Sequence, residues 1–143
     1  RRRSPTMKVS PLLHVLFIGY GWLPVAMALY AAQSLWFAGA GEFLLGRAPA
    51  HALFIGFFGS LLVAMVTRVT QGHSGRPLEL GRLAAFAFAL LQLVVLLRIA
   101  SEFSGDPWAL HAHAAVLWLV AFLPWVLRSA WIYLTPRADA QAG

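Results

Sequence analysis

The amino-acid sequence predicts an all-α membrane protein, a polytopic bundle of four transmembrane helices. Three observations support this fold class. Apolar residues make up 60% of the 143 residues and charged residues only 11%, whereas soluble proteins are about 45–50% apolar and about 25% charged. Four long segments carry no charged residue, and the basic residues gather at the ends of these segments. Polar side chains cannot cover so much apolar surface, so we expect it to face lipid.

The charge-free segments are residues 9–41, 48–67, 83–97 and 107–127. A helix needs about 20 residues to cross a hydrocarbon core of about 30 Å, and the first, second and fourth segments are long enough. The third is extended by Arg82 and Arg98, whose long side chains can reach the interface. Glycine- and proline-containing stretches separate the segments. We predict one domain over residues 1–143, with helices near 12–37, 50–70, 82–100 and 109–134.

The basic residues are distributed unevenly between the two sides of such a bundle. With four helices, both termini and the middle loop share one side, which carries nine of the eleven Lys and Arg residues: Arg1, Arg2, Arg3, Lys8, Arg68, Arg76, Arg82, Arg128 and Arg137. Only Arg47 and Arg98 lie on the other side. Cytoplasmic loops are enriched in Lys and Arg, so both termini are predicted to be cytoplasmic. The net charge of +6 is then a sign of topology, and we expect no nucleic-acid partner.

Two further features concern how the helices associate. Ala52, Gly56, Ser60 and Ala64 recur at four-residue steps, and small residues at this spacing allow helices to approach closely in lipid. Gln33 and Gln92 lie inside spans and should find hydrogen-bond partners on other helices. The chain opens with Arg1 and not with methionine, so we expect it to be the C-terminal part of a longer polytopic chain. The remaining helices, or further copies, would then be partners.

The five histidines are the candidate chemical groups, because the chain has no cysteine and its five acidic residues all lie outside the predicted spans. His51, His111 and His113 begin helices on the outer side, whereas His14 and His73 lie on the inner side. The two sets are roughly 25–30 Å apart, too far to share one metal ion. His51 can pair with His111 or with His113 across a haem or a metal ion. The alternative is that these outer histidines are interfacial and partly hydrated.

His111 and His113 are two residues apart, so on a helix they point about 200° away from each other. Only one of them should face a given partner helix. On the inner side, residues 67–77 combine Arg68, His73 and Arg76 with two glycines. The two arginines can pair with haem propionates, or the segment can be a basic cytoplasmic loop that contacts lipid phosphates.

Several strings of residues together resemble the NnrS family. They are His51-Ala52-Leu53 with Gly56 and Gly59, Met65-Val66-Thr67-Arg68, Gly72-His73-Ser74-Gly75-Arg76-Pro77-Leu78, and His14-Val15-Leu16 with Gly19-Tyr20-Gly21-Trp22-Leu23-Pro24. The resemblance covers Pro11 to about Pro77, and Ser74 stands where the family usually has threonine.

The resemblance implies a multi-pass protein of the bacterial inner membrane that contains haem and copper. It also implies a role in nitric-oxide metabolism or in resistance to nitrosative stress. His51, His73 and His14 are then candidate haem or copper ligands, whereas His111 and His113 match no motif of the family. Whether the protein catalyses a reaction, transports or senses is left open by the sequence. The alternatives are a cofactor-free transporter or channel and a structural transmembrane module.

Overall fold

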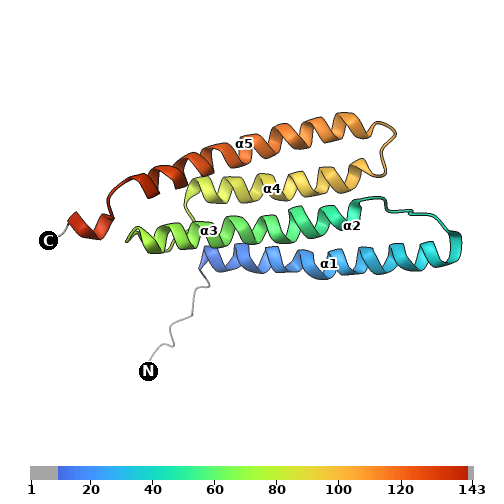
Figure 1. Cartoon of the computed structure of the whole chain (residues 1–143), viewed down its shortest axis with the longest axis horizontal. Coiled ribbons are helices and arrows are strands. Elements are labelled where there is room, and N and C mark those ends of the chain that lie inside the picture. The colour runs from blue at the N-terminus through green and yellow to red at the C-terminus, as the bar shows by residue number, and fades with distance from the viewer. Residues whose placement is uncertain (1–9, 142–143) are drawn as a thin grey trace, which may run out of the picture.

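The computed structural model describes residues 10–141 and confirms the predicted all-α fold (Figure 1). Within this part of the chain there is no strand. The elements are α1 (Pro11–Ala40), α2 (Ala48–His51), the π-helical η1 (Ala52–Gly59), α3 (Ser60–His73), α4 (Arg82–Ser101), α5 (Pro107–Leu134) and the short 3₁₀-helical η2 (Ala138–Gln141). Elements α2, η1 and α3 form one continuous span, and all four spans are long and apolar enough to cross a membrane. Each predicted range ends within three residues of the observed one.

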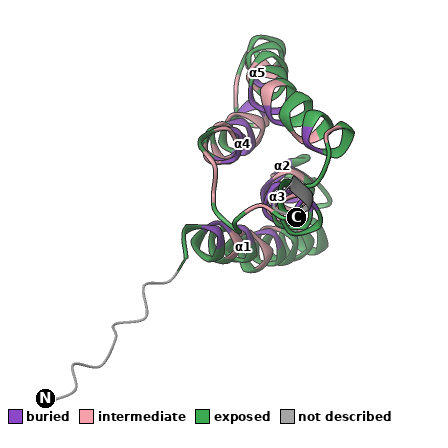
Figure 2. Cartoon of the chain, turned by 90° about the vertical axis from the view of Figure 1, so that its left-hand side faces the viewer, coloured by how far each residue is buried: buried purple, intermediate pink, exposed green. Residues whose placement is uncertain are grey.

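The four spans alternate in direction along the bundle (Figure 1). The second span packs between α1 and α4, and α4 packs against α5. We call the end that holds the start of α1, the end of α3 and the end of α5 the terminal end. The other end, with residues 41–47 and 102–106, is the distal end. Many residues on the outer faces of the helices are exposed (Figure 2), as expected where lipid replaces water.

Local sequence explains where the long helices begin and end. The Ser10 hydroxyl accepts a hydrogen bond from the Leu13 N–H at 3.3 Å, and the Asp106 carboxylate accepts one from the Ala109 N–H at 3.2 Å. A proline follows each of these caps at the first position of the helix, where a backbone N–H is not needed for a hydrogen bond within the helix. Helix α1 ends at Gly41, whose φ of +74° favours glycine.

The predicted small-residue stripe of the second span lies in the core of the bundle. Its four members, Ala52, Gly56, Ser60 and Ala64, are all buried. A Cβ atom at Gly19 of α1 would come within 2.8 Å of the Ser60 Cβ, and one at Gly56 would come within 2.6 Å of the Trp22 ring. These glycines therefore allow α1 and the second span to approach closely, which confirms the predicted helix–helix seam.

A polar network crosses the middle of the bundle. The indole N–H of Trp22 donates to Oε1 of Gln92 at 2.7 Å, and Nε2 of Gln92 donates to the Ser60 hydroxyl at 2.9 Å. The network joins α1, α3 and α4, as predicted for Gln92. The prediction for Gln33 is wrong, because its Oε1 atom is buried without a hydrogen-bond partner. No polar side chain from a neighbouring helix reaches it.

Replacing Gln92 with leucine is expected to destabilise the bundle by about 1–2 kcal/mol, because it removes three hydrogen bonds and leaves the Trp22 N–H without its acceptor. Unfolding of the purified protein in mixed detergent and dodecyl sulfate micelles measures this cost. Gln33→Leu is the matched control. It removes an amide whose oxygen has no partner, so it should cost nothing, and an equal cost for both variants would contradict the prediction.

Candidate metal centre at the distal end

Three ligating side chains meet at the distal end, each from a different part of the chain. His51 is the last residue of α2, Glu102 follows the end of α4, and His111 lies in the second turn of α5. A ring nitrogen of each histidine and a carboxylate oxygen of Glu102 all lie within 4.8 Å of one another. Only 11% of the His51 side chain and 16% of the Glu102 side chain are exposed. We call these three residues the His51 cluster.

The carboxylate of Glu102 is held by the loop between α1 and α2. Its Oε2 atom accepts a hydrogen bond from the Arg47 backbone N–H at 3.0 Å, while its Oε1 atom lies 3.3 Å from Nε2 of His51. Gly46 packs directly against the carboxylate and has a φ of +48°. Any side chain at position 46 would collide with Glu102 and strain the backbone. The loop therefore fixes one carboxylate oxygen and leaves the other facing the histidine.

The Nε2 atom of His51 is buried and lacks a hydrogen-bond partner. The Oε1 atom of Glu102 lies 3.3 Å away, within ion-pair distance of a protonated ring. A buried polar atom left unpaired costs about 1–3 kcal/mol, and native proteins contain few of them. A ring nitrogen in this situation, beside a carboxylate, fits a metal ligand.

The ring of His111 is oriented by Ser101, the last residue of α4. The Ser101 hydroxyl donates its single hydrogen to the Arg98 carbonyl oxygen at 2.7 Å. Its oxygen therefore remains as an acceptor for Nε2 of His111, 2.9 Å away. This assignment places the N–H on Nε2 and leaves the lone pair on Nδ1. A hydroxyl that fixes the tautomer of a histidine in this way is typical of the second layer around a metal.

Two imidazoles and a carboxylate form a donor set that suits copper or non-haem iron. The three residues therefore fit a single metal ion. They do not fit a haem held between His51 and His111, because the carboxylate of Glu102 lies beside both rings and leaves no space for the macrocycle.

An apolar groove begins one helical turn from the cluster. It has a volume of about 430 Å³ and is lined by Ile55, Val94, Arg98, Ala114, Ala115, Trp118 and Leu119. Ile55 and Ala115 each lie four residues beyond a histidine of the cluster, on the same helix. None of the three cluster residues lines the groove, which lies within one helical turn of them.

His113 takes no part in the cluster. Its side chain is exposed, and its Nδ1 atom lies 2.6 Å from the Ala109 carbonyl oxygen of its own helix. The expectation that only one of His111 and His113 faces the neighbouring helices is confirmed.

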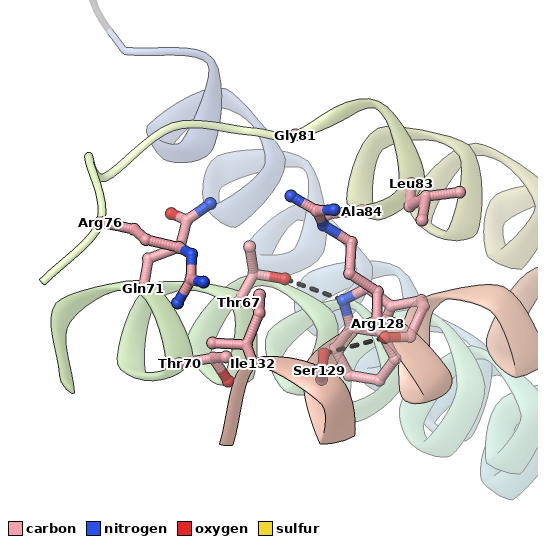
Figure 3. A pocket seen from close by; sticks show the side chains of 11 residues that line it. Thr67, Thr70, Gln71, Arg76, Gly81, Leu83, Ala84, Arg128, Ser129 and Ile132 are labelled. Carbon is pink, nitrogen blue, oxygen red and sulfur yellow. Dashed lines mark hydrogen bonds between the residues drawn. The ribbon is translucent and has the colours of Figure 1, made fainter. Parts of the chain in front are cut away.

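The other candidate residues lie at the terminal end, where His14, Arg68 and His73 are exposed. Arg68 and His73 line one groove of about 370 Å³ together with Met65, Val69, Gly72 and Leu78. His14 is not part of this lining. Arg76 lines a separate pocket with Arg128 (Figure 3), so the two arginines of residues 67–77 line different pockets. The loop turns after His73, and Arg76 is carried to the other side of α3.

Sequence reasoning missed Glu102 and Ser101. Glu102 is not among the predicted ligands because it lies outside the predicted spans. A residue just past the end of α4, however, has the same depth in the membrane as the histidines that begin the neighbouring helices. That shared depth was the available signal. Which face of α4 turns towards His51 could not be known without the packing.

A family model described as NnrS protein matches residues 1–137. The match covers nearly the whole chain, including all of α4 and α5, where the sequence strings above do not reach. No curated protein and no solved structure matches the chain.

Proposed function

The chain belongs to the NnrS family, and from this premise we propose that it is a bacterial inner-membrane protein that binds haem and copper and acts on nitric oxide. Its four apolar helices make it a multi-pass membrane protein with a lipid bilayer as its surroundings. The observation that carries the proposal is the His51 cluster, two histidines and a glutamate converging between three helices.

We assign the copper ion to the His51 cluster. The Nε2 atom of His51, the carboxylate of Glu102 and the oriented ring of His111 would be its ligands. Imidazole and carboxylate ligands are found for both copper and iron, and family membership favours copper. Arg47 and Ser101 are positioning residues, because each holds one of the ligands by a hydrogen bond.

We assign the haem to the groove at the terminal end. His73 would be a ligand to its iron, the guanidinium of Arg68 would pair with a propionate, and Met65, Val69 and Leu78 would form its apolar wall. His14 remains a second candidate ligand on the basis of the family resemblance. This division agrees with the separation of the inner and outer histidines by roughly the thickness of the membrane.

When bound, a copper or iron centre with an open coordination position would supply the place where nitric oxide binds. The chain contributes the surroundings of that position. Apart from Arg98, the lining of the groove beside the cluster is apolar, with Ile55, Val94 and Leu119 among its residues. It favours entry of a small uncharged gas from the lipid over entry of ions. Glu102 places its carboxylate beside the two imidazoles.

The metal content and spectrum of the protein test this function. The protein purified in mild detergent should contain copper and iron by elemental analysis, and should show a haem absorbance that changes on reduction with dithionite and on addition of nitric oxide. A flat visible spectrum together with the absence of both metals would overturn the proposal.

Replacing His73 with alanine should reduce haem content several-fold while copper stays unchanged, because His73 lies far from the His51 cluster. Absorbance of the extracted haem per mole of protein measures the effect. His113→Ala serves as the control, since it removes an exposed imidazole outside both sites. Haem content that is the same in both variants would clear His73 as a ligand.

A further inference from the structure

A polar pocket lies at the terminal end (Figure 3), and none of its lining residues lines the His73 groove. Its volume is about 50 Å³, and it is lined by Thr67, Thr70, Gln71, Arg76, Gly81, Leu83, Ala84, Trp125, Arg128, Ser129 and Ile132. The pocket thus brings together the end of α3, the loop before α4, the first turn of α4 and the end of α5. Two guanidinium groups line it, and no acidic residue is among its lining residues.

The two arginines enter the pocket from different elements. Figure 3 shows the side chain of Arg128 extending from α5 towards the first turn of α4, and the guanidinium of Arg76 beside Gln71 and Thr70. The Nη1 atom of Arg76 is buried and has no hydrogen-bond partner. The ion pairs found in residues 10–141 involve neither arginine. Asp139, which packs against Gly75, is bound by Arg137 through both carboxylate oxygens.

Gln71 holds the loop that carries Arg76. Its side-chain amide donates to the Glu79 carbonyl oxygen at 2.7 Å and accepts from the Glu79 N–H at 3.0 Å. Its backbone carbonyl accepts hydrogen bonds from the Arg76 N–H at 3.0 Å and from the Ser74 hydroxyl at 3.0 Å. The backbone of Arg76 is therefore held in place before any ligand arrives, which reduces the entropy cost of binding.

The start of α4 adds to the positive potential of the pocket. The residue before the helix is Gly81, so no side chain caps the first N–H groups of this 20-residue helix. Gly81, Leu83 and Ala84 all line the pocket. Uncapped N–H groups and the positive end of the helix dipole favour an anion at this position.

From the pocket, the two unpaired guanidinium groups and the uncapped helix start, we propose that the terminal end binds a phosphate-type oxyanion between Arg76 and Arg128. Guanidinium groups match the oxygens of phosphate. The Thr67 hydroxyl also lines the pocket, and because it accepts a hydrogen bond from the Trp125 N–H at 3.0 Å, its own hydrogen remains to be donated. The volume admits a group of a few atoms and no macrocycle. This site differs from both proposed metal sites and stands without them.

The same chemistry is available from a free anion and from a phospholipid headgroup. Trp131 and Tyr133 are 68% and 58% exposed at the same end of α5, and exposed aromatic residues of this kind are enriched at the depth of the lipid headgroups. The experiment therefore has two arms. One measures binding of inorganic phosphate to the full chain in neutral detergent by equilibrium dialysis. The other measures phosphatidylglycerol against phosphatidylcholine retained by the protein in native mass spectrometry.

Arg76→Gln and Arg128→Gln should each weaken phosphate binding, or retention of phosphatidylglycerol, at least tenfold. Arg82→Gln is the matched control, because Arg82 is exposed next to the pocket but does not line it. It should change binding less than twofold. Arg128→Lys keeps the charge and should retain most of the binding, which separates loss of the anion from loss of the fold.

A response in the dialysis arm identifies a free anion, and a response in the lipid arm alone identifies a headgroup; both support the site. The proposal is overturned if the wild-type chain binds neither ligand, or if Arg82→Gln weakens binding as much as the two pocket variants. The same measurements on a His51→Ala protein should give unchanged phosphate binding, so a failure of the metal proposal remains distinguishable.

Discussion

Replacing His51 with alanine is expected to lower bound copper at least tenfold. His51 supplies a buried ring nitrogen that has no hydrogen-bond partner in the fold, and the remaining ligands, Glu102 and His111, cannot complete the site. Loss of residues that only orient a ligand already costs about 10–100-fold in metal affinity, and loss of a ligand itself should cost at least as much. Copper per mole of protein after dialysis against a weak chelator measures the effect.

The control for this experiment is His113→Ala, which removes an imidazole two residues from His111 that points away from the cluster. Its copper content should equal that of the wild type. Ser101→Ala should fall between the two, since it leaves all three ligands but frees the ring of His111. Equal copper in the His51→Ala and His113→Ala proteins would remove the His51 cluster as the copper site.

Replacing Gly19 with alanine should destabilise the bundle by about 1–3 kcal/mol, the usual cost of overpacking a close interface. The added Cβ atom would lie 2.8 Å from the Ser60 Cβ. That Cβ is fixed to the helix backbone and cannot turn aside, so α1 and the second span would have to separate. Thermal or dodecyl-sulfate unfolding, followed by circular dichroism, measures the change.

Gly21→Ala is the matched control, because it introduces the same side chain on the same helix two residues away. No atom lies within 4 Å of a Cβ built at Gly21, and alanine favours a helix over glycine by about 1 kcal/mol. The control protein should therefore be as stable as the wild type or more stable. A Gly19→Ala protein of equal stability would show that the seam between α1 and the second span is not tightly packed.

Particular residues show how much of the structure the sequence predicted. The spans were predicted to within three residues, because charges, prolines and glycines mark their ends. The buried stripe of Ala52, Gly56, Ser60 and Ala64 was also predicted, because small residues at this spacing allow helices to pack closely in lipid. The π-helical turn of Ala52–Gly59 was not predicted. Its hydrogen bonds run from each residue to the fifth one along, and nothing in the local residue pattern required them.

The sequence by itself determined the depth of every candidate residue, because a helix rises by a constant 1.5 Å per residue from ends that the charges mark. It therefore separated the outer histidines from His14 and His73. Only the tertiary structure decided which residues at one depth meet: His51 with His111 and Glu102 rather than with His113, and Arg76 with Arg128 rather than with Arg68. The rotation of each helix and the path of each loop depend on contacts between residues far apart in the chain, and those contacts have no counterpart in the local sequence.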